Sequence, residues 1–288
     1  MRALVTDVCI SEFGWELMEW QGYVRKKAEL CDKVVVCSSV GNFVLYRDLS
    51  PIYIGHSIRG NRDCHAIRRG TLVNPEELKR VQHALAQAED DLRQQQYHIT
   101  KISPTDKGRL TRRSIGQQKF IPFGDASKVR KPYKLIIHAR NRLTSCYSTG
   151  ANYPIDRWND LIRRLRSEGI DSIGAVGTKD AAMLPERVDD LRGIALSDVM
   201  DHMAAANFVM GPSSGPMHLA SLCQTPHVVW ATSRKQEVLG GEGNAIRYQK
   251  LWNPFGTPVA VLLHKKNEIL SPRAILELTM KFIGELVE

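Results

Sequence analysis

The residues best suited to chemistry lie in one short segment, Gly211-Pro212-Ser213-Ser214-Gly215-Pro216-Met217-His218. An apolar run precedes this segment, and proline at Pro216 suits the first turn of a helix, so we predict a strand, a tight loop and a helix. Backbone N–H groups at such a helix start point at one spot, with the positive end of the helix dipole behind them. The serine hydroxyls and the His218 imidazole can reach the same spot. The segment therefore predicts an anion site, most simply for phosphate; the alternative is that glycine and proline only punctuate an ordinary crossover.

The string G-P-S-S-G-P-M-H-L-A resembles a signature of one enzyme family. It is similar to the G-P-x-S-G-P-x-H-x-A signature of the heptosyltransferase-like (family nine) glycosyltransferases of the GT-B fold. In that family the loop lies against the diphosphate of a nucleotide-sugar. The match is longer and more specific than a lone glycine-rich loop. The resemblance implies a set of donor-binding residues: Ser213, Ser214, Gly215, Pro216, Met217 and His218.

Two arginines, Arg140 and Arg142, end an apolar strand that begins at Tyr133. Residues two apart in extended chain lie on the same side, and two planar guanidinium groups suit a diphosphate. The alternative is a pair of surface arginines at a strand exit. The string His138-Ala139-Arg140 also resembles the entry strand of the family's donor domain. The family places a further loop near the nucleoside, which implies donor contacts from Thr178 and Lys179.

Two carboxylates, Glu12 and Glu16, flank the turn between the first predicted strand (residues 3–10) and the helix that follows Gly14. Open α/β proteins bind ligands at this edge of the sheet, where a carboxylate can act as a general base. The alternative is a carboxylate that only stabilises a helix N-terminus. The family's loop reads Gly-Asp-x-Leu, with the acid beside glycine as the catalytic base. Here the loop reads Gly14-Trp15-Glu16-Leu17 and a second acid precedes it, so both glutamates remain candidates.

Basic residues dominate two predicted loops, residues 56–70 and 101–131, and the net charge of the chain is +9. The first loop would lie at the sheet edge, which makes four arginines candidates for acceptor binding: Arg59, Arg62, Arg68 and Arg69. The second is either a solvated linker or a basic flap over a polyanionic acceptor. A basic protein favours acidic partners such as nucleotide phosphates, nucleic acid or an anionic membrane surface met peripherally.

Strands and helices alternate along the whole chain, which predicts an α/β fold with two Rossmann-like domains facing a cleft, as in GT-B proteins. Residues 1–125 would form the acceptor-side domain and residues 126–270 the nucleotide-sugar-binding domain. The resemblance to GT-B proteins also implies that the last helix, residues 271–288, packs back toward the first domain. Asn74-Pro75 predicts the start of a long helix that ends near residue 96, and residues 233–257 read as mostly loop.

The cysteines and apolar runs favour the cytoplasm. Six cysteines occur without C-x-x-C spacing, as expected for reduced thiols. No apolar run approaches the roughly 20 residues that span a bilayer, and the chain runs from Met1 directly into a strand without a secretory leader. No Asp-x-Asp occurs, so a metal clamp has no obvious ligands, and we expect neither a metal nor a cofactor beyond the donor substrate.

Together these features predict a hexosyl- or heptosyltransferase type of enzyme. It would be a nucleotide-sugar-dependent, metal-independent, inverting glycosyltransferase that acts on a hydroxyl of an anionic acceptor, such as a cell-surface glycan or lipid-linked sugar. Three alternatives remain: a phage-type transferase that modifies hydroxylated bases in DNA, a nucleotide-sugar epimerase, and a nucleotide-sugar-binding protein without transfer.

Overall fold

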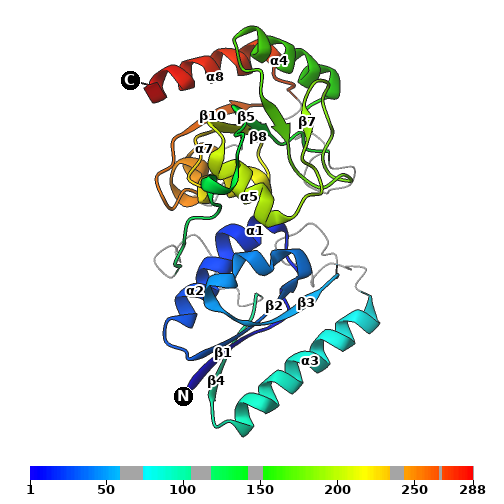
Figure 1. Ribbon diagram of the computed structural model, residues 1–288, viewed down its shortest axis with the longest axis vertical. Coiled ribbons are helices and arrows are strands. Elements are labelled where there is room, and N and C mark those ends of the chain that lie inside the picture. The colour runs from blue at the N-terminus through cyan, green and yellow to red at the C-terminus, as the bar shows by residue number, and fades with distance from the viewer. Residues whose placement is uncertain (59–73, 105–117, 142–151, 234–242, 266–267, 288) are drawn as a thin grey trace. The chain divides into compact units, whose positions relative to one another are not determined.

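A computed structural model describes residues 1–58, 74–104, 118–141, 152–233, 243–265 and 268–287 of the chain. It divides into two compact units, Met1–Phe120 and Ile121–Glu288. Each unit contains its own parallel sheet with helices packed on it (Figure 1), which confirms the predicted α/β class with Rossmann-like units. No helix within the described residues is long and apolar enough to cross a membrane.

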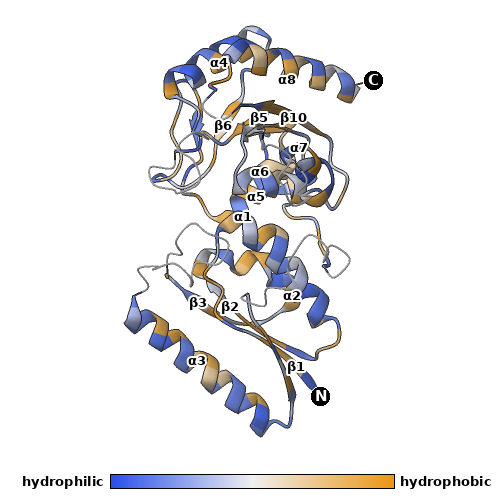
Figure 2. Ribbon diagram, turned by 180° about the vertical axis from the view of Figure 1, so that it is seen from behind, coloured by the Kyte–Doolittle hydropathy of each residue, from blue (hydrophilic) through white to orange (hydrophobic). Residues whose placement is uncertain are grey.

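The first unit contains a four-stranded parallel sheet with strand order β3-β2-β1-β4. Side chains alternate between its faces, and Ala3 and Val5 pack with the apolar side of the long helix α3. Hydrophobic residues follow the strands and one side of this helix (Figure 2). The strands are β1 (Arg2–Thr6), β2 (Lys33–Ser39), β3 (Ile52–His56) and β4 (His98–Ile102).

Three short helical pieces run without a break after the first strand: α1 (Phe13–Trp15), the π-helical η1 (Glu16–Trp20) and α2 (Gln21–Ala28). Two 3₁₀ segments, η2 (Val40–Leu45) and η3 (Arg47–Leu49), follow β2. Helix α3 (Pro75–Gln94) begins as predicted, because the Asn74 side chain accepts hydrogen bonds from the Glu76 and Glu77 N–H groups at 3.0 and 3.4 Å.

Strand β4 corrects the prediction of a loop that starts at residue 101. It pairs in parallel with β1 over its full length, from His98 to Ile102. The alternating segment His-Ile-Thr-Lys-Ile is a typical half-exposed edge strand, with Ile102 buried and Lys101 exposed. Its lysine and its position directly after a polar helix end made it resemble a loop.

The second unit contains a six-stranded parallel sheet with strand order β10-β9-β8-β5-β6-β7. Helices α4 and α8 cover one face, and α5 and α6 cover the other (Figure 1). The strands are β5 (Leu135–Ile137), β6 (Ile173–Ala175), β7 (Asp189–Asp190), β8 (Phe208–Pro212), β9 (His227–Thr232) and β10 (Val259–His264). The helices are α4 (Ile155–Ser167), α5 (Leu196–Ala205), α6 (Gly215–Leu222), α7 (Asn244–Ile246) and α8 (Pro272–Val287), with 3₁₀ segment η6 (Ala126–Lys128) and π-helical η8 (Arg247–Leu251).

The final helix, α8, belongs to the core of the second unit. Ile275 and Phe282 are buried in the same cluster as Trp158 and Leu161 of α4. The apolar side of α8 packs on α4 and β10. That residues 271–288 also pack back toward the first domain stays a prediction.

Candidate active site

The carboxyl ends of β5 and β8 form the point where the second sheet reverses its order of growth. From β5 the chain adds β6 and β7 on one side, whereas β8, β9 and β10 follow on the other side. The loops after β5 and β8 therefore leave in opposite directions, and open α/β sheets bind ligands in the crevice that such loops create. Arg140 follows β5, and the Ser213-Ser214-Gly215 loop follows β8.

Arg140 and Ser213, two of the predicted donor-binding residues, are in contact at this edge of the sheet. The Arg140 side chain is 8% exposed, and its Nη1 atom donates to the Ser213 carbonyl oxygen at 3.5 Å. The neighbouring Gly211 permits the close approach of the two strand ends. A Cβ atom at Gly211 would lie 2.9 Å from the His138 carbonyl oxygen and 3.1 Å from the Met217 sulfur. A guanidinium group is thus held directly beside the loop.

The loop itself has the predicted strand-loop-helix form. Ser214 is the N-cap of α6 in extended conformation, and Pro216 occupies the first turn. Within the described part of the chain, the N–H groups of Ser214 and Gly215 have no acceptor, whereas the Ser213 N–H group donates to the Trp230 carbonyl oxygen at 2.9 Å. The two free N–H groups and the helix dipole are the anion-binding elements that the sequence predicts.

Met217 and His218 contribute less to an anion site than the sequence suggests. Their N–H groups donate to the Ser214 carbonyl oxygen at 3.1 and 3.3 Å. The Met217 side chain is fully buried. Burial, and secondarily the charge of nearby His227, lower the pKa of His218 to about 3. The His218 imidazole is therefore uncharged near neutral pH, and its predicted contact with the anion would be a hydrogen bond without a positive charge.

Two aromatic residues that the sequence analysis missed hold the His218 ring. The ring stacks on Tyr248 with centroids 5.2 Å apart, and it meets the Trp252 ring in an edge-to-face arrangement with centroids 4.4 Å apart. Tyr248 also donates from its hydroxyl to Ser213 Oγ at 2.9 Å. Both residues lie in the range 233–257 that was interpreted as loop, where α7 and η8 form instead. The Tyr-Gln-Lys-Leu-Trp spacing, which puts two aromatic side chains four residues apart, was the available signal.

The loop that contains Thr178 and Lys179 lies next to the Arg140 segment. The Asn141 N–H group donates to the Ala181 carbonyl oxygen at 2.8 Å, and the Met183 N–H group donates to the Ala139 carbonyl oxygen at 2.7 Å. Thr178 and Lys179 are both exposed at this edge of the sheet. The remaining predicted arginines lie outside the described residues: Arg142, Arg59, Arg62, Arg68 and Arg69.

Glu12 lies in the first unit, where the loop after β1 enters the first helical turn. Two bonds tie this loop to neighbouring strand ends: Cys9 N–H donates to the Cys37 carbonyl oxygen at 3.0 Å, and His56 Nε2 lies 2.9 Å from the Cys9 carbonyl oxygen. Glu12 is the N-cap residue of α1, and its carbonyl oxygen accepts from the Glu16 N–H group at 3.0 Å. Its side chain is half-buried and makes no capping bond. The carboxylate is thus partly accessible at the carboxyl edge of the sheet.

Glu16, the other candidate, is 1% exposed and points into the first unit. Its Oε1 atom accepts hydrogen bonds from Ser38 Oγ at 2.6 Å and Tyr46 OH at 2.7 Å, and its Oε2 atom accepts from Asn42 Nδ2 at 2.7 Å. Burial raises the pKa of Glu16, although these three bonds oppose the shift. The Glu16 carboxyl group is thus enclosed within the first unit, whereas that of Glu12 is partly accessible.

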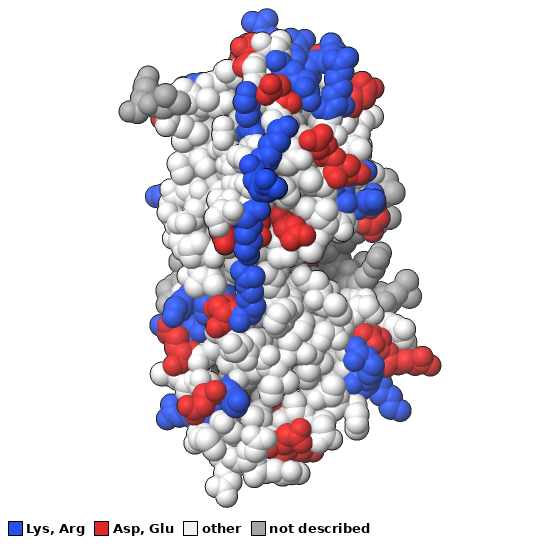
Figure 3. Space-filling model, viewed as in Figure 1, with Lys and Arg blue, Asp and Glu red and all other residues white. Residues whose placement is uncertain are grey.

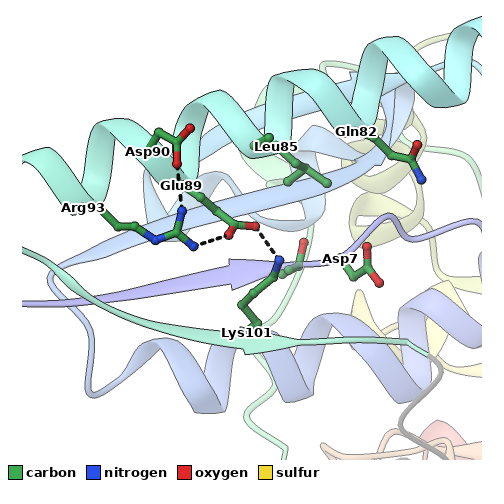
Figure 4. A pocket seen from close by; sticks show the side chains of 9 residues that line it. Asp7, Gln82, Leu85, Glu89, Asp90, Arg93 and Lys101 are labelled. Atoms are coloured by element: carbon green, nitrogen blue, oxygen red, sulfur yellow. Dashed lines mark hydrogen bonds and ion pairs between the residues drawn. The ribbon is translucent and has the colours of Figure 1, made fainter.

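A separate hollow of about 260 Å³ lies between α3 and the end of β1 (Figure 4). Three carboxylates and two cations line it, and four of these five groups form ion pairs. Glu89 pairs with Arg93 at 3.0 Å and with Lys101 at 2.6 Å, and Arg93 also pairs with Asp90 at 2.8 Å. Asp7 lies at its rim and accepts from the Val8 N–H group at 2.8 Å. The Glu89–Lys101 pair links α3 to β4 of the sheet.

Comparison with known proteins identifies the fold. No protein-family model matches the chain, and no curated protein matches it in sequence. Among solved structures it is similar to the ADP-heptose LPS heptosyltransferase II of E. coli, at 13% identity and a TM-score of 0.62, with all of both chains covered. The chain has the fold of the heptosyltransferases.

Two further solved structures have a similar fold. A family 9 glycosyltransferase from Veillonella parvula matches at 12% identity and a TM-score of 0.59, covering 99% of this chain and 97% of that one. The E. coli heptosyltransferase WaaC, solved with ADP, matches at 16% identity and a TM-score of 0.55, covering 98% of this chain and all of that one. The predicted resemblance and the GT-B-like fold are confirmed.

Proposed function

We propose that this protein is an inverting, metal-independent glycosyltransferase that transfers a sugar from a nucleotide-sugar to a hydroxyl group. The observation that carries the proposal is the meeting of Arg140 with the Ser213-Ser214-Gly215 loop at the switch point of the second sheet. The Arg140 guanidinium, the N–H groups of Ser214 and Gly215 and a helix N-terminus converge there, and these groups suit a diphosphate. The fold supports the proposal, because similar structures are heptosyltransferases and one was solved with ADP.

In the proposed reaction the donor's diphosphate is the leaving group. Negative charge develops on it as the bond to the sugar breaks, and Arg140 and the loop stabilise this charge. Pro216 and Met217 shape the helix start, and the exposed Thr178 and Lys179 extend the donor site toward the nucleoside. Met217 is fully buried beneath the loop, and this packing helps to hold the loop's N–H groups in position.

Inversion needs one carboxylate that removes the proton from the attacking hydroxyl. We assign this role to Glu12, because it is partly accessible and lies at the carboxyl edge of the first sheet. Glu16 is unsuited to it, because its oxygens are enclosed by three donors.

The proposed metal independence is supported by the ligand groups of the chain. The sequence has no Asp-x-Asp, and among the described residues no three His, Cys, Asp or Glu side chains are grouped so that they could hold a metal ion. One structural neighbour, TibC from enterotoxigenic E. coli, is described as iron-containing, and it matches at 11% identity and a TM-score of 0.53. In this chain Arg140 and the helix N-terminus would fill the charge-neutralising role of a metal.

A panel of nucleotide-sugars and acceptors tests the proposal. A true donor at about 100 times its Kd should stabilise the protein by about 2.7 kcal/mol, which thermal unfolding detects. Absence of stabilisation by every donor in the panel would contradict the proposal. An isomerised donor without acceptor would indicate an epimerase, and donor binding without turnover would indicate a binding protein.

We place the reaction in the cytoplasm, since the buried Cys9, Cys37 and Cys223 are free thiols.

Replacement of Arg140 by alanine is expected to weaken donor binding about ten- to a hundredfold. The substitution removes a charge-assisted contact worth roughly 1.5 to 3 kcal/mol. Calorimetric titration with the donor measures the change. Arg273→Ala is the matched control, because that arginine is exposed on α8 and pairs only with Glu277 among the described residues. Equal affinity in the two variants would remove Arg140 from the donor site.

We propose an anionic acceptor, and a glycan or lipid-linked sugar in preference to DNA. Support comes from the net charge of +9. In the second unit acids accompany several basic side chains (Figure 3), for example Lys134 with Asp171 at 2.9 Å and Arg163 with Asp160 at 3.0 Å. Such pairs leave less free charge for a long polyanion. We therefore expect duplex DNA to bind weakly and with a shallow salt dependence. Loss of about 0.9 log units of affinity per tenfold salt for each of many phosphates would favour DNA instead.

A further inference from the structure

Tyr248 joins the two side chains that flank the anion loop of the second unit. It lies on η8, is fully buried, and donates from its hydroxyl to Ser213 Oγ at 2.9 Å. The face of the same ring stacks on His218, with an interplanar angle of 18°. One residue from a segment 35 positions along the chain thus contacts the loop before α6 and the first turn of α6.

The segment that carries Tyr248 is itself fixed to both sides of the loop. Asn244 Nδ2 donates to the Thr232 carbonyl oxygen at 2.9 Å, at the end of β9. Ser221 Oγ donates to the Trp252 carbonyl oxygen at 2.6 Å, and Thr257 Oγ1 donates to the Ser221 carbonyl oxygen at 3.1 Å, which ties the segment to α6. Tyr248 is therefore held in place independently of any ligand.

A serine hydroxyl has one hydrogen to donate and two lone pairs that accept. When Tyr248 donates to Ser213 Oγ, one lone pair is occupied and the serine hydrogen remains available for another acceptor. The Ser213 backbone is fixed at the same time by its N–H bond to the Trp230 carbonyl oxygen. The hydroxyl is thereby prepared as a donor at the place where Arg140 contacts the same residue.

We propose that Tyr248 is a positioning residue that directs the Ser213 hydroxyl hydrogen toward the diphosphate of the donor. The inference rests on the proposed donor site, and it adds a residue and a role that the site's own loop does not contain. Phenylalanine would fill the same space and keep the stacking on His218, so the hydroxyl group is what carries the role. Without it, the Ser213 hydroxyl is free to rotate and spends part of its time turned away from the ligand.

The test measures the Kd values of ADP, UDP and GDP by calorimetric titration, and the tightest of these diphosphates serves for the variants. Tyr248→Phe is expected to weaken its binding about five- to tenfold, and Ser213→Ala by a similar factor. The double variant should bind no more weakly than Ser213→Ala, because the tyrosine acts through that serine. Tyr153→Phe is the matched control, since Tyr153 is another buried tyrosine of this unit whose hydroxyl donates to one carbonyl oxygen, that of Leu270, at 3.1 Å. It should leave the affinity unchanged.

Two binding results would overturn the inference: an affinity of Tyr248→Phe equal to that of Tyr153→Phe, or additive losses of binding free energy in the double variant. A melting temperature of Tyr248→Phe lower by about 10 °C or more would also overturn it, because the hydroxyl would then be a structural requirement. Failure of the wild-type protein to bind any of the diphosphates would instead overturn the donor site itself, and the role of Tyr248 with it. Normal binding by the wild type with an unaffected Tyr248→Phe would remove only the positioning role.

Discussion

Glu12→Gln should lower turnover by about two to four orders of magnitude and leave donor binding unchanged. The amide has the shape of the carboxylate but cannot take a proton from the acceptor hydroxyl. Stability should change little, because the side chain is only half-buried and the amide keeps the size and shape of the carboxyl group. Initial rates at saturating donor, together with the donor's Kd, measure the two effects separately.

Glu19→Gln provides the control for this substitution. Glu19 is a half-buried acid in the helical run that follows Glu12, and it lies outside the proposed site. It should keep turnover within about threefold of the wild type, as expected for a residue that is distant from the chemistry. Turnover by Glu12→Gln at the level of the control would mean that another group accepts the proton.

The donor loop could be predicted from the sequence because all of its parts are close together in the chain. Gly211, the serines and Pro216 determine a strand end, a tight turn and a helix start through local backbone preferences. Arg140 could be placed at the same site because both segments end strands of one parallel sheet, and the structure confirms that Arg140 contacts Ser213. Local spacing and sheet topology were sufficient for this part.

The groups that support the loop could not be predicted, because their contacts depend on tertiary packing. Tyr248 bonds a serine 35 residues earlier in the chain. The neutral state of His218 follows from its burial by Tyr248 and Trp252, and no spacing pattern shows that burial. The sequence places the His218 imidazole near the anion but does not show its charge, which depends on the burial of the ring.

The choice between Glu12 and Glu16 also depends on tertiary contacts that the sequence does not show. The two acids are four residues apart, and the sequence gives both the same position at the end of the first strand. The three groups that enclose Glu16 come 22, 26 and 30 residues later, at Ser38, Asn42 and Tyr46. Only the folded first unit brings them to Glu16, and their presence distinguishes an enclosed carboxyl group from an accessible one.

Glu16→Ala and Glu16→Gln are expected to differ sharply, because the role of Glu16 is to accept hydrogen bonds. The alanine variant leaves three buried donors without an acceptor and should lower the free energy of unfolding of the first unit by about 3 to 5 kcal/mol. The glutamine variant can keep all three bonds. Its Oε1 atom accepts from Ser38 and Tyr46, and the Asn42 amide can turn to accept from its Nε2 group.

The pH dependence of stability gives this comparison a second measurement. Since burial raises the pKa of Glu16 in the folded state, the folded protein binds more protons than the unfolded chain between the ordinary pKa of 4.5 and the raised value. The wild type therefore loses stability as pH rises through that window, whereas Glu16→Gln has no carboxyl group to ionise. Urea unfolding should show the glutamine variant at least as stable as the wild type at pH 7, with the difference in stability shrinking below about pH 4.5.

Turnover should follow stability. Glu16→Gln should retain turnover, whereas Glu16→Ala should lose it because the first unit no longer folds. A stable Glu16→Gln protein that binds donor but has lost turnover would identify Glu16 as the base in place of Glu12.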